Sequence, residues 1–382
     1  MDLDFTEEQK MFQKSVRDFA RTEVAPLVDR AEKDEMTPVQ LFPTMGQLGY
    51  LCVHYPAEYG AAGLGEIENC ILIEEMSRIA HGICGSIMVH SGVGTSAIKD
   101  HGSTYLKERY LVSAIKGTMI SCFGLSEACA GSDAASIQTT AKKSGGNYIL
   151  NGSKMYITNG SICDFSTVAA YTDKSKSHRG ISLFAVGKDT PGFARAKLHK
   201  FCIRSSDTAE FSFNESPVPA ENLIGEEGRG FQYLMETLDI GRISHAASRL
   251  GAAQEVSEMT LEYAKQRVQF GRPIASNQAI AFKLARMAMD IESLRWMVYR
   301  AAWLYDNNRP CAKEASMTKL LASEVYQRTA VEAAQIHGGA TALEESPINR
   351  HYRDAYIGRI TEGTSEIQEL VIARQLGIKD LK

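Results

Sequence analysis

The chain has 382 residues, which is long for one hydrophobic core and predicts two or three packed subdomains. Its hydrophobic content of 44% and charged content of 23% are ordinary for a globular protein. A formal net charge of −4 argues against nucleic acid or an anionic membrane as the main partner, although a local basic patch for one phosphorylated ligand remains compatible with it.

No apolar run reaches the roughly 18 residues that a membrane-spanning helix needs. The acidic, polar start of the chain, residues 1–8, resembles neither a secretory signal nor a transit peptide. The eight cysteines are scattered and form no CxxC pair. We therefore expect free thiols in a reducing cytoplasm, without a metal site or a disulfide framework.

Residues 1–118 predict an N-terminal helical domain. Thr6 and Gln9 have the spacing of a capping box that begins the first helix. The glycine-rich stretch 58–65 is a loop but not a dinucleotide-binding loop, because no strand precedes it. The helical periodicity covers residues 6–20, 39–48, 66–79, 83–98 and 107–116.

Residues 119–229 predict a middle β-domain. The turn signals Ser144–Asn147, Asn151-Gly152 and Asn159-Gly160 fit hairpins or tight corners between short strands. Such short, regular strands suggest a small antiparallel barrel or sandwich. The expected strands cover residues 119–125, 139–142, 148–150, 154–158, 167–171, 181–186, 194–198 and 210–213.

Residues 230–382 predict an antiparallel bundle of helices. The fold class is therefore mainly α with a central β-domain, in the order helical domain, β-domain, four-helix bundle. Apolar residues recur at three- and four-residue spacing over residues 231–266, 278–307, 311–336, 347–356 and 365–376.

Glu362 lies in the short loop before the last of these helices. Ser365 and Gln368 have the spacing of a capping box, so the helix should begin at Ser365. Gly363 would let the backbone come close to a bulky neighbour. On local grounds alone, a single acid before a helix is usually no more than a favourable contact with the helix dipole.

Several stretches carry a more specific signal: residues 125–133 (LSEACAGSD), 154–160 (KMYITNG), 267–274 (RVQFGRPI), 335–339 (QIHGG) and 358–368 (GRITEGTSEIQ). In this order, they resemble the acyl-CoA dehydrogenase family of flavoproteins along essentially the whole chain. Residues 238–243 (LDIGRI) look most like its short-chain, butyryl-type branch. The resemblance implies FAD bound between the β-domain and the bundle.

The resemblance assigns part of the flavin site to the β-domain. Backbone amides and the Ser126 hydroxyl would bond to the polar edge of the ring and stabilise the reduced flavin. Tyr156 stands where the family usually has Trp, so we expect the packing of the flavin to differ in detail. The alternative, apart from the family resemblance, is that a tyrosine in a strand is simply a core aromatic. The implied contacts are Phe123, Leu125, Ser126, Gly131, Ser132, Tyr156 and Thr158, with Thr364 and Glu366 from the last loop.

A second group resembles residues that reach the pyrophosphate and adenine side of FAD across a subunit interface. These are Arg267, Phe270 and Gln278, and the arginine fork suits a diphosphate. Gln335 with Gly338 and Gly339 would admit the phosphates and adenosine. Contacts borrowed from a neighbour imply an oligomer, and the family resemblance makes a homotetramer the expected one. Without the resemblance, Arg267 would be interpreted as a surface arginine and the two glycines as a helix C-cap.

The resemblance makes Glu362 the base that removes the α-proton of an acyl-CoA thioester while flavin N5 accepts the β-hydride. The thioester oxygen would bond to the Glu362 N–H and a ribityl hydroxyl of FAD. Some relatives place the base at the position of Gly241, which has no carboxylate here. The resemblance also implies that Ser132, Asp239 and Arg242 contact the CoA portion of the substrate. The alternative for Asp239 and Arg242 is an ordinary surface ion pair.

Thr361 and Gly363 flank the base and would touch the substrate. Thr361 stands where the family commonly has Tyr, so a branched, cyclic or functionalised acyl group is an open alternative to a short straight one. The expected electron acceptor is electron-transferring flavoprotein. The alternatives are an acyl-CoA oxidase, a flavin monooxygenase (which would not need Glu362), a dehydrogenase for carrier-protein thioesters and a non-enzymatic flavin-binding protein.

Overall fold

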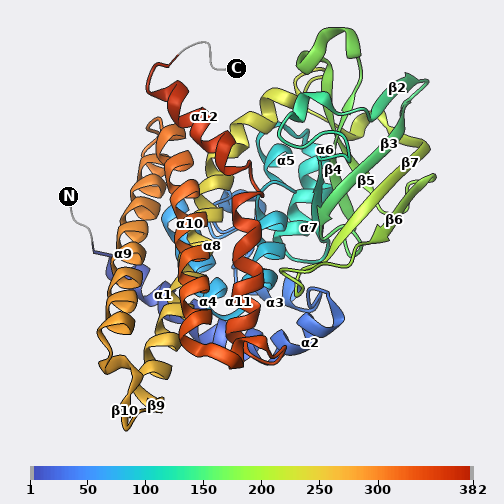
Figure 1. Ribbon diagram of the computed structural model, residues 1–382. Helices are drawn as coiled ribbons and strands as arrows, with labels where there is room; N and C mark the ends of the chain where they lie inside the picture. The colour runs from blue at the N-terminus through green and yellow to red at the C-terminus, as the bar shows by residue number, and fades with distance from the viewer. Residues whose placement is uncertain (1–3, 379–382) are drawn as a thin grey trace.

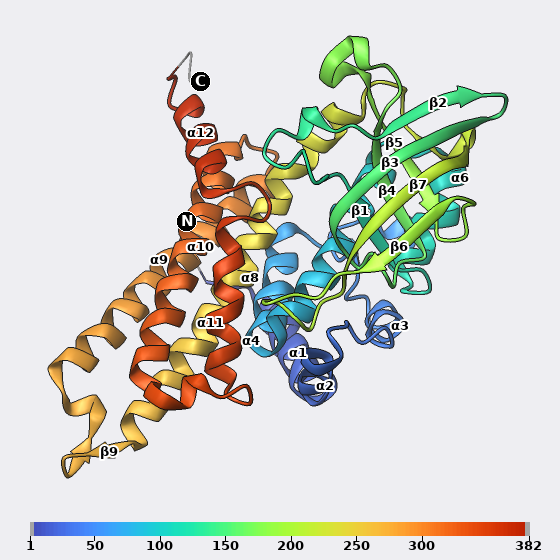
Figure 2. The same cartoon turned by 45° about the vertical axis from the view of Figure 1, so that its right-hand side comes forward.

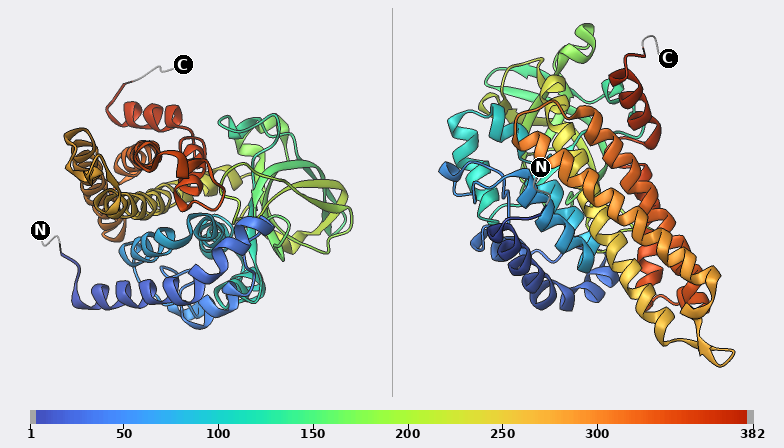
Figure 3. Two further views of the ribbon diagram at one scale, coloured as in Figure 1. Left: turned by 60° about the horizontal axis from the view of Figure 1, so that its bottom comes forward. Right: turned by 90° about the vertical axis from the view of Figure 1, so that its left-hand side faces the viewer.

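The computed structural model describes residues 4–378. Two groups of helices pack side by side, and a single large sheet lies at one end of both (Figure 1; Figure 3, left). This is the mainly helical fold with a central sheet region that the sequence predicts. In the described part of the chain, no helix has both the length and the apolar character needed to cross a membrane.

The helices before the sheet begin as expected. Thr6 accepts a hydrogen bond from the Gln9 N–H and completes the predicted capping box of α1. The expected helices 66–79 and 83–98 are instead one helix with a break at Ala80 (φ −148°), which ends at Ser91. The α-helices are α1 (Glu7–Phe19), α2 (Val28–Asp34), α3 (Leu41–Gln47), α4 (Glu66–Ser91), α5 (Ser96–His101), α6 (Thr104–Leu106) and α7 (Val112–Ile115).

The sheet has the order β6-β7-β3-β2-β4-β5-β8, with β1 beside β4, and is an open, sandwich-like layer and not a closed barrel (Figure 2). It is also not wholly antiparallel, because β1 and β4 run parallel. Its strands are β1 (Ser121–Gly124), β2 (Thr140–Ser144), β3 (Asn147–Thr158), β4 (Phe165–Tyr171), β5 (Ile181–Gly187), β6 (Phe193–Lys197), β7 (Thr208–Pro219) and β8 (Leu223–Ile224).

The predicted turn at Asn151-Gly152 is wrong. Residues 147–158 form one strand, β3, whose register with β7 shifts between Leu150 and Gly152 and again between Lys154 and Ile157. Gly152 accommodates the first irregularity at φ 142°, where an added Cβ would lie 2.6 Å from the Thr139 hydroxyl. An Asn-Gly pair can therefore mark a bulge inside a strand as well as a hairpin turn.

The helices after the sheet match the predicted bundle closely. A small hairpin that the sequence did not reveal joins α8 to α9 and projects from the far end of the bundle (Figure 1). The elements are α8 (Gly230–Gln266), β9 (Val268–Gln269), β10 (Arg272–Pro273), α9 (Gln278–Asp306), α10 (Ala312–His337), α11 (Pro347–Ala355) and α12 (Ser365–Gln375).

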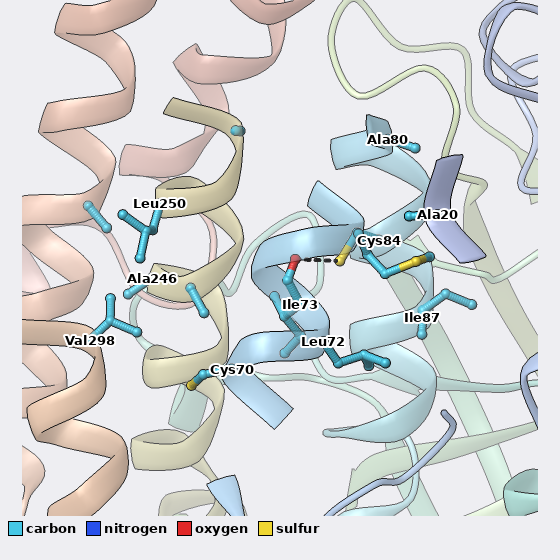
Figure 4. Packing of buried hydrophobic residues seen from close by; sticks show 14 of the residues in the cluster. Ala20, Cys70, Leu72, Ile73, Ala80, Cys84, Ile87, Ala246, Leu250 and Val298 are labelled. Carbon is cyan, nitrogen blue, oxygen red and sulfur yellow. Dashed lines mark hydrogen bonds between the residues drawn. The ribbon is translucent and has the colours of Figure 1, made fainter. Parts of the chain in front are cut away.

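The two groups of helices share one core around α4. In Figure 4, Ala246 and Leu250 of α8 lie on the side that faces Val298 of α9, and α4, with Cys70, Leu72 and Ile73, lies on the other side of α8; all belong to one buried cluster. Asp306 at the end of α9 also caps α4, since its carboxylate accepts hydrogen bonds from the N–H groups of Glu66 and Ile67 at 2.7 and 3.1 Å. This packing fixes α8, which carries one wall of the site described next.

Candidate active site

Glu362 lies in a tight loop whose backbone is left-handed at two successive residues, Glu362 (φ 57°) and Gly363 (φ 86°). A non-glycine residue in that region is uncommon and must be held there. Buried Gln368 holds it by donating hydrogen bonds to the carbonyl oxygens of Glu362 and Gly363 at 3.0 and 3.1 Å. An added Cβ on Gly363 would lie 2.7 Å from the same amide nitrogen, so only glycine fits there.

The helix cap differs from the prediction. Thr364, not Ser365, caps α12, and its hydroxyl accepts a hydrogen bond from the Ile367 N–H. The Gln368 side chain is therefore free to turn back onto the loop and does not close a capping box. Glu366 is exposed in the first turn of α12.

The Glu362 carboxylate lies against Gly241 of α8. A Cβ placed on Gly241 would be 3.4 Å from Glu362 Oε2, which is ordinary van der Waals contact. The two positions at which the family resemblance would allow a base thus face the same space. Only position 362 supplies a carboxylate.

Burial raises the pKa of Glu362, and the nearby cations Lys319, Arg242 and Arg249 oppose that rise. A carboxylate whose pKa is raised holds a proton more strongly, which is the direction that general-base chemistry at a weak carbon acid requires.

Lys319 is fully buried behind the loop, on α10. Its ammonium donates a hydrogen bond to the Gly363 carbonyl oxygen at 2.6 Å. Burial lowers its pKa to about 7, with Arg249 adding repulsion and Glu362 acting in the opposite direction. Lys319 was not predicted from the sequence, because nothing in the helical pattern distinguishes a buried lysine from a solvated one.

Asp239 and Arg242 form an ion pair at 3.2 Å, three residues apart on α8. Arg242 is 6% exposed, and within residues 4–378 its Nε has no hydrogen-bond partner, so the arginine of this pair is buried while Asp239 is partly exposed. Burial lowers the pKa of Arg242, and Asp239 and Glu362 act in the opposite direction. The pair lies one turn or less from Gly241 and thus beside the Glu362 carboxylate.

Thr361 makes a hydrogen bond between its hydroxyl and Nε2 of buried His245 at 2.9 Å. His245 and Arg249 follow Gly241 at intervals of four residues and therefore share its face of α8. A helical wheel of residues 231–266 places both residues on the face of Gly241, which is the sequence signal that could have revealed them.

The loop of residues 125–133 is tied to β3 by a buried ion pair. Lys154 donates to Glu127 Oε1 at 2.8 Å and to the Leu125 carbonyl oxygen at 3.0 Å. Although burial acts to raise the pKa of Glu127, Lys154 and Thr139 hold it below its usual value. The Ser126 carbonyl also accepts a hydrogen bond from the Met155 N–H at 2.8 Å. Phe123, Leu125 and Ser126 are half-buried along this edge.

The surface next to that loop is open and carries an aromatic ring. Tyr156 is 70% exposed with φ 63°, at the second register shift of β3, and half-buried Thr158 ends the strand. Gly131 and Ser132 are exposed, and no atom lies within 4 Å of an added Cβ on Gly131. An exposed ring beside an accessible backbone fits a large planar ligand.

The remaining predicted residues lie elsewhere on the chain. Arg267 and Gln278 are exposed, and Phe270, at the tip of the β9–β10 hairpin, is fully exposed. This hairpin is at the opposite end of the bundle from α12 (Figure 1). Gln335 and Gly338 line a groove of about 660 Å³ with Phe201 and Tyr352, and Gly339 is exposed beside it.

Three family profiles cover most of the chain: the N-terminal domain of acyl-CoA dehydrogenase matches residues 6–118, the middle domain residues 122–216 and the C-terminal domain residues 228–377. The chain belongs to the acyl-CoA dehydrogenase family. It is therefore an oxidoreductase of a family that uses FAD, and the exposed Tyr156 ring and open Gly131 backbone fit that cofactor.

Solved structures that resemble this chain agree with its membership of the family. Butyryl-CoA dehydrogenase from Megasphaera elsdenii is 39% identical, with a TM-score of 0.95 over 99% of this chain and 100% of that one. A chain in the structure of the electron transferring flavoprotein of Acidaminococcus fermentans is 39% identical, with a TM-score of 0.96 over the whole of both chains. The prolyl acyl carrier protein oxidase AnaB is 31% identical, with a TM-score of 0.93 over 98% of this chain and 100% of that one.

The buried pair under the 125–133 loop gives a testable prediction. Glu127→Gln should lower the free energy of unfolding by about 3–5 kcal/mol, because it leaves the buried Lys154 charge without a carboxylate, with the Leu125 carbonyl as its remaining acceptor. Thermal and denaturant unfolding would measure this loss. The double variant Glu127→Gln/Lys154→Met is the matched control and should recover much of the stability; a double variant as unstable as the single one would contradict this explanation.

Proposed function

We propose that this protein catalyses the α,β-dehydrogenation of an acyl-CoA thioester to the trans-2-enoyl-CoA, with Glu362 as the base that takes the α-proton. The observation that carries the proposal is the Glu362 carboxylate itself, packed against Gly241 in a loop held by buried donors. Burial already raises its pKa, and a bound substrate that displaces water would raise its basicity further.

The chain supplies the base and the orientation of the thioester. We propose that the Glu362 N–H donates to the thioester oxygen, where negative charge develops as the proton leaves. Gly363 leaves room for the ligand beside the loop, and Ser132, Asp239 and Arg242 contact the CoA portion. When bound, FAD supplies the hydride acceptor for the β-carbon.

We place FAD between the middle domain (119–229) and the bundle (230–382), with 1–118 as the third domain. Ser126 and the backbone of the 125–133 loop would bind the edge of the ring, Tyr156 and Thr158 its face, and Thr364 and Glu366 its other side. Gln335, Gly338 and Gly339 would hold the phosphates and adenosine; their groove beside α10 supports this placement.

A homotetramer would complete the cofactor site. Phe270 is fully exposed at the tip of a projecting hairpin, and Arg267 and Gln278 flank it. A hairpin that ends in a bare aromatic ring is well suited to insert into a neighbouring copy, where these three residues would reach its FAD.

The unpaired state of all eight cysteines supports a cytoplasmic location.

We propose electron-transferring flavoprotein as the acceptor, since the chain is similar along its whole length to one in a structure of that flavoprotein. The similarity to butyryl-CoA dehydrogenase supports a short acyl group. The similarity to a carrier-protein oxidase supports a second candidate, oxidation of a carrier-bound acyl group. Peroxide produced in proportion to a carrier-protein substrate, without an added acceptor, would favour that second candidate.

Glu362→Gln should retain FAD and bind acyl-CoA but bleach its flavin at least about 100-fold more slowly, because a general base contributes that much or more. Anaerobic stopped-flow absorbance would measure the rate. Glu369→Gln, an exposed acid on α12, is the control and should behave as wild type. Bleaching of Glu362→Gln at the wild-type rate would rule out the assigned base.

Lys319→Met should move the acid limb of the pH–rate profile to higher pH. The Lys319 cation lowers the pKa of Glu362, so its removal raises the pH at which Glu362 loses its proton and becomes a base. The difference from wild type should be largest below about pH 7, where Lys319 is itself charged.

The flavin reduction rate as a function of pH is the measurement, with FAD content recorded at each pH. Lys313→Met, on the same helix but paired with Glu314 near the surface, is the control and should leave the midpoint unchanged. An unchanged or more acidic midpoint for Lys319→Met would contradict the electrostatic role of Lys319.

A further inference from the structure

One face of α8 runs along the loop that carries the base. Gly241 faces the Glu362 carboxylate, His245 bonds to Thr361, and a Cβ on Gly358 would be 3.5 Å from Arg249 Nε. Arg249 is about 12 Å along the helix axis from Gly241. Because long side chains on a helix lean back towards its N-terminus, the guanidinium is carried towards Thr361 and the base.

Arg249 is a buried cation without a counter-ion. It is 6% exposed. Within residues 4–378, no carboxylate lies close enough to form an ion pair with its guanidinium, that is, within 4.0 Å. In the part of the chain that the structure describes, its one hydrogen bond, to the His245 carbonyl, is long at 3.5 Å, and its Nε has no acceptor. Burying a guanidinium without a counter-ion is energetically unfavourable, so we expect an anion to complete the site.

The surroundings of Arg249 are also basic. Burial and then Arg249 lower the pKa of both His81 and His245, and Nδ1 of His245 has no partner. Lys319 lies on the other side. Two acids are near enough to act on Arg249, but Glu362 must remain free to accept a proton, and Asp354 is bonded to the Ile203 N–H at 2.5 Å.

We propose that Arg249, with His245, binds a carboxylate at the far end of the acyl group, so that the substrate is a short ω-carboxyacyl-CoA. The inference rests on the proposed dehydrogenation and adds its substrate class. A carboxylate matches the arginine fork and would neutralise the charge of Arg249, which has no ion-pair partner among residues 4–378. Thr361, beside the base, is small and carries no ring, and its hydroxyl is hydrogen-bonded to His245.

The test compares acyl-CoAs that differ only at the end of the chain, using the FAD-loaded enzyme. Glutaryl-CoA is matched with pentanoyl-CoA and adipyl-CoA with hexanoyl-CoA. We expect wild-type kcat/KM to favour one ω-carboxy member over its match by at least about 100-fold, because a site built for a polar group rejects analogues that leave it unpaired. Arg249→Met should remove that preference. Because Arg249 also lowers the pKa of Glu362, the two members of each pair are compared at the same pH, where a change in the base affects both members equally.

The controls separate binding from folding. Arg30→Met removes an arginine at the exposed surface and should keep the wild-type preference. Arg249→Lys keeps the charge without the fork and should retain part of it. If Arg249→Met does not bind FAD, the test rests on two ratios of kcat/KM between the ω-carboxy and straight-chain thioesters: the ratio of the wild type and the ratio of Arg249→Lys.

Three outcomes would overturn the inference: a wild-type enzyme that prefers the straight-chain members, a preference that survives in Arg249→Met, or equal losses on both members of each pair, which would mean that Arg249 supports Glu362 and not the substrate. The proposed function fails separately, when no thioester of the panel bleaches the flavin. Bleaching by pentanoyl-CoA without any preference for glutaryl-CoA or adipyl-CoA would leave dehydrogenation standing and remove only the carboxylate site.

Discussion

The candidate active site depends on two buried hydrogen-bond donors that hold the loop carrying Glu362 in place. Gln368 and Lys319 bind the carbonyl oxygens of Glu362 and Gly363, and they come from two different helices, α12 and α10. Together they keep successive residues in a left-handed conformation that an unsupported loop would rarely adopt. The carboxylate is thereby presented to α8, whose own position is fixed by its packing against α4.

The same arrangement sets the charge of the site. A carboxylate in this position would lose basicity if the cations around it dominated, and gain it if burial dominated. Burial prevails, since the pKa of Glu362 is raised despite Lys319, Arg242 and Arg249. Arg242 has Asp239 as a partner and Lys319 is close to losing its proton at neutral pH, so Arg249 is the cation whose charge remains to be balanced.

Periodicity was sufficient to predict the order of the elements and most helix bounds, because long amphipathic helices and short alternating strands leave a clear pattern. It failed at β3, where Asn151-Gly152 forms a bulge and the two halves stay in one strand, and at α12, where Thr364 and not Ser365 caps the helix. In both cases two local structures have similar sequence signals: a turn or a bulge at Asn151-Gly152, and a cap at Thr364 or at Ser365. Tertiary contacts determine which of the two forms. Glu362 was found through a family pattern, whereas Lys319, His245 and Arg249 depend on burial, which a helical pattern alone does not report.

The most direct test of the central claim is solvent exchange at the α-carbon. Holoenzyme and an excess of acyl-CoA are mixed anaerobically in D₂O, and deuterium at the α-carbon of the recovered thioester is followed by mass spectrometry. If Glu362 is the base, wild type incorporates deuterium and Glu362→Gln, with FAD still bound, does not. Incorporation at the same rate in both proteins would show that another group removes the proton and would contradict the account.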